Sequence, residues 1–113
     1  MDELTQKLTS GTHPVTVGGP QPSLEDFRRR VEELGYAFIK FTGTRGGTDL
    51  GVRLDRAACS IDAAAFDEAG GSVHLEGTLI LNDDPVRCIA DIDTSTLDGA
   101  GHLTSVTEAE LID

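Results

Sequence analysis

Apolar and polar positions alternate along several stretches of the chain, and alternation with period two is typical of a strand with one buried face. The clearest case is residues 49–55, where Leu50, Val52 and Leu54 are separated by polar residues or glycine. Similar or shorter apolar patterns occupy residues 14–17, 36–41, 74–81, 86–93 and 102–106. Because most of these six segments follow one another through short turns, they predict an antiparallel sheet.

One stretch has the period of a helix instead. Its apolar positions, spaced i, i+3, i+7 and i+10, are Leu24, Phe27, Val31 and Leu34. Ser23 is a preferred N-cap residue, and Gly35 stands where a glycine commonly ends a helix. These signals predict an amphipathic helix over residues 24–34.

A single amphipathic helix can cover only one face of such a sheet. We therefore expect an α+β fold, a curved antiparallel β-sheet of about five to six strands packed on one N-terminal helix, as in cystatin-like and hotdog-like rolls. The alternative is a small closed β-barrel that the helix plugs or flanks. The length of 113 residues predicts one α+β domain over residues 13–113, preceded by a flexible N-terminal arm at residues 1–12.

Residues 74–93 are predicted to form a β-hairpin, and its register places acidic side chains together. With the turn centred on Asp83 and Asp84, the inward pairs are all small or apolar. The opposite face then carries the pairs Ile80–Arg87, Thr78–Ile89, Glu76–Asp91 and His74–Asp93. Two carboxylates that face each other across a ladder repel when both are ionised, so this face is the best functional lead.

Three interpretations of this face stay open. In the first, the face is exposed to water, where the repulsion costs under about 1 kcal/mol. In the second, it is a metal site, or a dimer interface in which Arg53 or Arg87 of a second copy neutralises the acids. In the third, it lies in a pocket. In a pocket, one carboxylate would have a raised pKa and could perform acid–base catalysis. The candidate catalytic residues are His74, Glu76, Asp91, Asp93 and Tyr36, and the candidate ligand-binding residues are Phe38, Arg53, Ile80, Arg87 and Ile89.

Composition narrows the partners. Nine Lys and Arg against 20 Asp and Glu give a net charge of −11, which disfavours nucleic acids and anionic membranes because both repel an acidic chain. The chain has no apolar run long enough to span a membrane and no apolar leader, so a cytoplasmic location is expected. The excess of Arg over Lys, with much Ala and Gly, is typical of a GC-rich bacterial genome.

No metal and no cofactor are expected. The chain lacks the HxH and HExxH zinc patterns and the lysine of a P-loop. Asp91, Asp93 and Ser95 have the spacing of a calcium loop, but Thr96 and His102 replace the glycine and glutamate that such a loop needs. Cys59 and Cys88 are expected to be unpaired, because no export signal points to an oxidising compartment.

Two functions are compatible with these patterns. The first is a small-molecule-binding protein whose pocket lies on the second face of the sheet, with cofactor-independent acid–base catalysis of the isomerase, cyclase or dehydratase type as its enzymatic form. The second is a non-catalytic homodimeric accessory or interaction protein that uses the same face as its interface.

Overall fold

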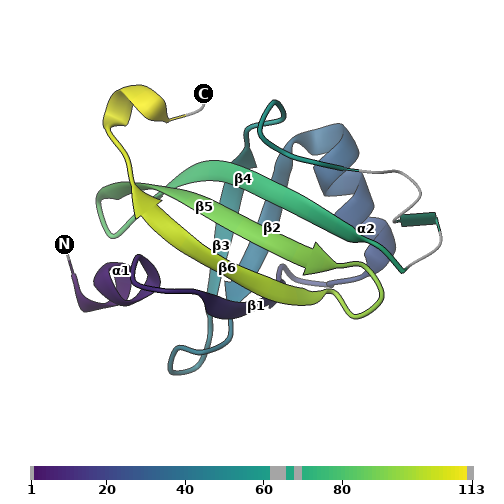
Figure 1. The fold of residues 1–113 in the computed structure, drawn as a ribbon, viewed down its shortest axis with the longest axis horizontal. Helices are drawn as coiled ribbons and strands as arrows, with labels where there is room; N and C mark the ends of the chain where they lie inside the picture. Colours follow the sequence, from purple (N-terminus) through teal and green to yellow (C-terminus); the bar gives the residue numbers. More distant parts are fainter. Residues whose placement is uncertain (1, 62–65, 68–69, 112–113) are drawn as a thin grey trace.

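The computed structural model describes residues 2–61, 66–67 and 70–111, and within them six strands form a closed antiparallel barrel (Figure 1). The strands are β1 (His13–Val17), β2 (Tyr36–Phe41), β3 (Thr48–Leu54), β4 (Ser72–Leu81), β5 (Asp84–Asp93) and β6 (Asp98–Ser105). They follow chain order round the barrel, and β1 closes it by pairing with both β2 and β6. The sheet is thus antiparallel, as predicted.

Closure supports the small closed barrel and not the open roll wrapped on a helix. An open sheet would leave β1 and β6 as edges, whereas here four residue pairs join them. The inward-facing side chains of all six strands then form the barrel interior themselves. They are fully or almost fully buried, for example Val15, Ile39, Val52, Leu75, Ile92 and Leu103.

The predicted helix is present with both of its predicted ends. α2 (Leu24–Arg29) begins after Ser23, whose hydroxyl accepts a hydrogen bond from the backbone of Asp26. It continues as a π-helical turn, η1 (Arg30–Leu34), and ends at Gly35 in the left-handed conformation. Phe27 and Val31 are fully buried, but Leu34 is half exposed because the wider π-helical turn shifts it out of the apolar stripe.

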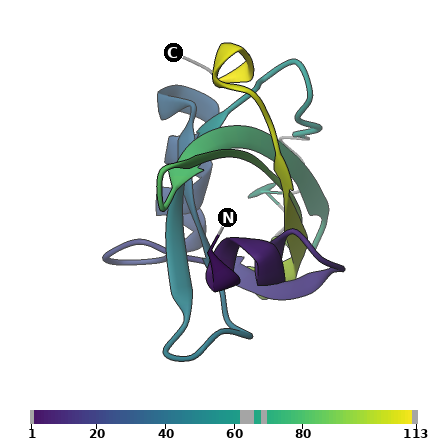
Figure 2. The same ribbon diagram turned by 90° about the vertical axis from the view of Figure 1, so that its left-hand side faces the viewer.

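Short helices flank the two ends of the barrel sequence. α1 (Glu3–Leu8) lies within the segment predicted to be an arm, and it is packed there, with Thr5 and Leu8 fully buried. Figures 1 and 2 show α1 lying across one end of the barrel. At the other terminus, the 3₁₀ helix η2 (Glu108–Glu110) follows β6 and is capped by Thr107. No helix in the described ranges has both the length and the apolar character to cross a membrane.

The β4–β5 hairpin exists, but its predicted register is wrong. The turn is formed by Asn82 and Asp83, which both have positive φ angles (47° and 70°), so Leu81 lies opposite Asp84. The predicted turn would have required Pro85 to donate a backbone hydrogen bond across it, and proline has no N–H. The shift moves the partners of every residue by two positions and leaves each side chain on its predicted face.

Candidate functional site

The corrected register places His74, and not Glu76, opposite Asp91. His74 lies between two carboxylates: its Nδ1 is 2.7 Å from Asp91 Oδ1 and its Nε2 is 2.7 Å from Glu76 Oε2. Arg87 Nε donates to Glu76 Oε1 at 3.0 Å, and Arg87 Nη2 donates to Asp55 Oδ2 at 2.9 Å. We call this chain of five side chains the outer ion network. In it, each cation lies between two acids.

The segment that follows β3 folds against β4 and completes this network. The backbone N–H of Asp55 donates to the carbonyl of Glu76 at 2.8 Å, and Ser60 pairs with His74 in an isolated bridge. Between them, the Cys59 thiol donates to the Glu76 carbonyl and accepts from the Glu76 N–H. Asp55 therefore reaches Arg87 because of a loop contact, and a sequence pattern gives no signal for that contact.

The charges of the outer ion network stabilise one another. The hydrogen bond to Glu76, followed by the one to Asp91, raises the pKa of His74 above its ordinary value. His74 and then Arg87 lower the pKa of Glu76. An acid–base pocket was expected to raise a carboxylate pKa, but Glu76 is instead held ionised by two cations. The network has the electrostatics of a structural ion-pair cluster.

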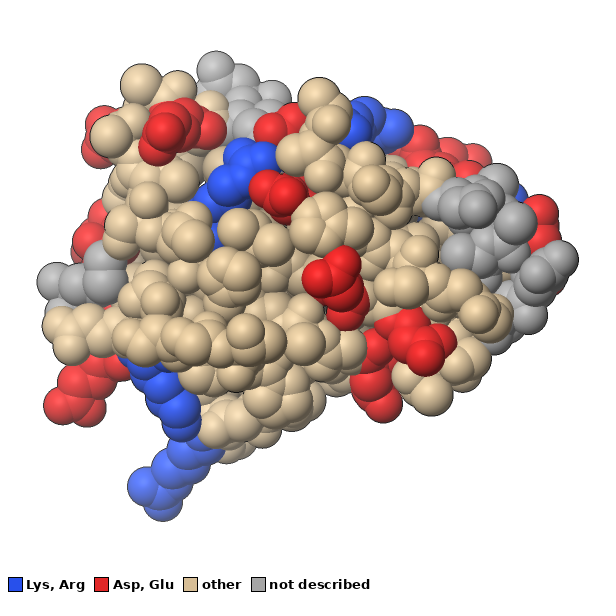
Figure 3. Space-filling model, in the orientation of Figure 1, with Lys and Arg blue, Asp and Glu red and all other residues tan. Residues whose placement is uncertain are grey.

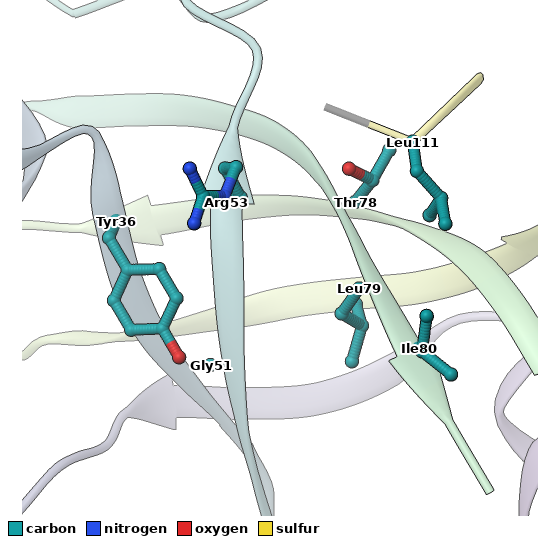
Figure 4. Close-up of a pocket in the computed structure, with 7 residues that line it drawn as sticks. All are labelled: Tyr36, Gly51, Arg53, Thr78, Leu79, Ile80 and Leu111. Atoms are coloured by element: carbon teal, nitrogen blue, oxygen red, sulfur yellow. The ribbon is translucent and has the colours of Figure 1, made fainter. Parts of the chain in front are cut away.

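A separate hollow of about 410 Å³ lies on the outer surface between β3 and β4 (Figure 4). In the described residues these strands pair only at Arg53–Thr78 and Leu54–Gly77, and Figure 4 shows them diverging beyond that point. We call this space the seam hollow. Its lining is mixed, with aliphatic side chains beside hydroxyl and guanidinium groups, and consists of Tyr36, Gly51, Arg53, Thr78, Leu79, Ile80 and Leu111.

Strand pairing sets the polar part of the seam hollow. Tyr36 on β2 lies opposite Arg53 on β3, which lies opposite Thr78 on β4, so the three form one row across the sheet. The ring of Tyr36 covers Gly51, where an added Cβ would be 1.8 Å from the phenolic oxygen. Glycine at this position therefore lets the tyrosine lie flat along β3 and form one wall.

Arg53 differs from Arg87, the other arginine on the described strands. It is exposed, and no carboxylate in the described part of the chain forms an ion pair with it. Arg87 lies on the neighbouring strand opposite Thr78, but Glu76 and Asp55 occupy its donors. Arg53 is thus an exposed guanidinium on the wall of the seam hollow.

The candidate residues fall into two places rather than one pocket. His74, Glu76, Asp91 and Arg87 meet in the outer ion network, whereas Tyr36, Arg53 and Ile80 line the seam hollow. The hollow also includes Gly51, Thr78, Leu79 and Leu111, none of which was singled out as a ligand-binding residue. Gly51 could have been found from the sequence, because a glycine within a strand often marks a place where another group approaches the backbone closely. The sequence gives no signal that Leu111 of the C-terminal segment lies beside β4.

Three of the predicted site residues belong neither to the outer ion network nor to the lining of the seam hollow. Phe38 packs edge-on against Tyr36 with ring centroids 5.4 Å apart, and the Arg30 guanidinium covers it at 4.9 Å. Ile89 lies opposite Glu76 and is partly buried. Asp93, the last residue of β5, accepts hydrogen bonds from the backbone and hydroxyl of Ser95 and so stabilises the following turn outside the network.

Within the described residues, no group of three His, Cys, Asp or Glu side chains is arranged to hold a metal ion. Cys59 and Cys88 are free thiols. Cys88 is buried inside the barrel, and this burial raises its pKa to about 12. It is therefore protonated at neutral pH and contributes to packing.

Comparison with models of known protein families and with curated proteins finds no match. The outer ion network and the seam hollow are consequently the features from which a function can be argued.

Proposed function

We propose that this protein binds a small, largely apolar molecule in the seam hollow. The observation that carries the proposal is a concave space of about 410 Å³ with aliphatic walls and a guanidinium that has no acidic partner in the described residues. Ligand sites in proteins commonly have volumes of about 300–1,000 Å³, apolar walls and a few polar groups that fix orientation. Leu79, Ile80 and Leu111 supply the apolar walls, and Tyr36 and Arg53 supply the polar groups.

Binding has more support than acid–base catalysis. His74 lies four residues along β4 from Thr78, which is about 13 Å at about 3.3 Å per residue. Its two carboxylate neighbours already hydrogen-bond to it, and Glu76 has a lowered pKa. A carboxyl group that acts as a general acid near neutral pH would need a raised pKa. We therefore propose a binding role and give the outer ion network a structural one.

Titration by ¹H–¹⁵N NMR tests the binding role, with phenylacetate, phenylacetamide and 2-phenylethanol as ligands. We expect chemical-shift changes centred on Tyr36, Gly51 and Ile80 for at least one of them. Ile80→Glu should weaken binding, because it places a charge on an apolar wall. Leu34→Glu is the matched control, since Leu34 is similarly exposed (51% against 61% for Ile80) and does not line the hollow. Shifts absent for all three ligands, or unaffected by Ile80→Glu, would contradict the proposal.

The same face supports a second candidate function, a homodimeric interaction protein. Ile80 is 61% exposed and Tyr36 is 36% exposed, and large exposed apolar side chains near each other are typical of interfaces. Phe38 is a poorer interface candidate than the sequence indicated, because Tyr36 and Arg30 already cover it. Sedimentation velocity should then show a dimer that Ile80→Glu dissociates and Leu34→Glu does not. A monomer at high concentration would exclude this function.

A further inference from the structure

We infer that the ligand of the seam hollow is a small monocarboxylate, whose carboxylate Arg53 binds and whose apolar body lies against Leu79, Ile80 and Leu111. This inference rests on the binding role proposed above and adds the chemical class of the ligand. Three observations carry it: the Arg53 guanidinium, which has no carboxylate partner among the described residues, the arrangement of polar and apolar walls, and the limit that the charge of the chain sets.

Among the described residues, Arg45, Arg53 and Arg56 form no ion pair with a carboxylate, and of these only Arg53 lines the seam hollow. Arg28 and Arg30 are each within 2.8 Å of a carboxylate oxygen, and Arg87 contacts two carboxylates. Arg53 has no such partner in the described residues, although it lies in the centre of the sheet with strands on both sides. A planar guanidinium with vacant donors matches a carboxylate in geometry and charge.

The walls of the seam hollow are polar at one end and apolar at the other. Arg53 and the flanking Tyr36 and Thr78 form a polar row across three strands. Leu79 and Ile80 continue along β4 away from this row, and Figure 4 shows them on the opposite side of the hollow from Tyr36. A ligand with one polar end and a compact apolar body fits this order, and a uniformly polar one does not.

The overall charge limits how much negative charge a ligand of this site can carry. Acidic side chains are scattered over the face seen in Figure 3, and the formal net charge is −11. Such a field repels polyanions, and the repulsion grows with the number of charges they carry. One guanidinium in the hollow can neutralise one carboxylate but not a di- or triphosphate. A monocarboxylate is thus the anion that the site accepts at the lowest electrostatic cost.

Isothermal titration calorimetry with phenylacetate and phenylacetamide tests the inference, because these ligands have nearly the same shape and differ in charge. We expect phenylacetate to bind about tenfold more tightly than the amide, as a charge-assisted hydrogen bond predicts. Arg53→Met should remove this preference, and Arg53→Lys should restore part of it. Arg45→Met is the control, since Arg45 is an exposed turn residue outside the hollow that loses the same charge.

The outcomes separate this inference from the proposal beneath it. Equal binding of the acid and the amide, weakened by Ile80→Glu, would overturn the monocarboxylate and leave the binding role standing. Absence of binding for both ligands would overturn the monocarboxylate, and absence of binding for 2-phenylethanol as well would overturn the binding role. A phenylacetate affinity that falls equally in Arg53→Met and Arg45→Met would also overturn the inference, because the effect would then come from net charge. Inorganic phosphate should not bind, and binding tighter than that of phenylacetate would contradict the assignment to a carboxylate.

Discussion

His74 on β4 lies directly opposite Asp91 on β5, with His74 Nδ1 at 2.7 Å from Asp91 Oδ1. Its other ring nitrogen is 2.7 Å from Glu76 Oε2. Ionised carboxylates can only accept hydrogen bonds, so both nitrogens can donate only when the ring is doubly protonated. The two contacts therefore favour the charged form of His74, and in this form the ring separates two acids that would otherwise repel each other.

The first prediction is that His74 titrates above its ordinary pKa of 6.5. The hydrogen bond to Glu76 is the largest cause, and the bond to Asp91 follows. Glu76→Gln should therefore lower the pKa of His74 more than Asp91→Asn does. NMR titration of the imidazole resonances measures the pKa of His74 in the wild type and in both variants. A wild-type pKa at or below 6.5 would show that the two hydrogen bonds do not persist in solution.

The second prediction concerns the stability that this network adds as pH changes. A raised folded-state pKa means that His74 stabilises the fold fully below pH 6.5 and loses this contribution as pH rises through its folded-state pKa. Glu76 and Asp55 have lowered pKa values, so their contributions are full above about 4.5 and 3.8 and are lost on acidification. The stabilising contributions of all three side chains are therefore fully present together between about pH 4.5 and 6.5. His74→Gln should therefore cost about 1 kcal/mol at pH 6 and clearly less at pH 9, measured by urea unfolding.

The third prediction is that Arg87→Met lowers the free energy of unfolding by about 1 kcal/mol at low salt. The variant leaves Glu76 and Asp55 without their shared cation, and both side chains are partly buried. Screening should reduce the loss in 1 M salt, because the contacts remain accessible to water. Arg45→Met removes the same charge from an exposed turn and serves as the control. Equal losses in the two variants would assign the effect to net charge.

The fourth prediction is that Gly77→Ala destabilises the β3–β4 seam by about 1–3 kcal/mol. A Cβ at this position would lie 2.3 Å from the carbonyl oxygen of Arg53 and 2.6 Å from Val52 Cγ1, so the strands must move apart. Gly43→Ala is the matched control, since its Cβ would meet only Pro14, at an ordinary 3.6 Å. Thermal unfolding compares the two variants, and a neutral Gly77→Ala would show that the strands are not in register there.

The fifth prediction is that Asp83→Gly stabilises the protein by about 0.5–1 kcal/mol, which raises Tm by about 3 °C, because relief of the positive-φ strain outweighs the greater freedom of glycine in the unfolded chain. Asp83 has a φ of 70°, a conformation that glycine adopts without the steric cost paid by other residues. Asp83→Ala removes the same negative charge but keeps the Cβ, so it should not stabilise. If both substitutions raise Tm equally, the gain comes from relief of charge repulsion and not from the turn.

Local patterns in the sequence determined which residues face inward and where the helix begins and ends. Alternation assigned His74, Glu76 and Asp91 to one face of the hairpin, and the structure places them there. Ser23 and Gly35 marked the helix ends correctly because capping depends on the conformation of single residues. These features involve neighbours in sequence, so they can be inferred without the fold.

Tertiary structure decided the pairing of those faces and the site itself. A strand pattern with period two is unchanged when the partners shift by two positions, so it could not show that Asp91 meets His74 and not Glu76. Barrel closure depends on the pairing of β1 with β6, which are the first and last strands of the chain. Asp55 and Leu111 reach the outer ion network and the seam hollow only through contacts between distant segments. Such contacts depend on the packing of the whole barrel, and no local pattern encodes them.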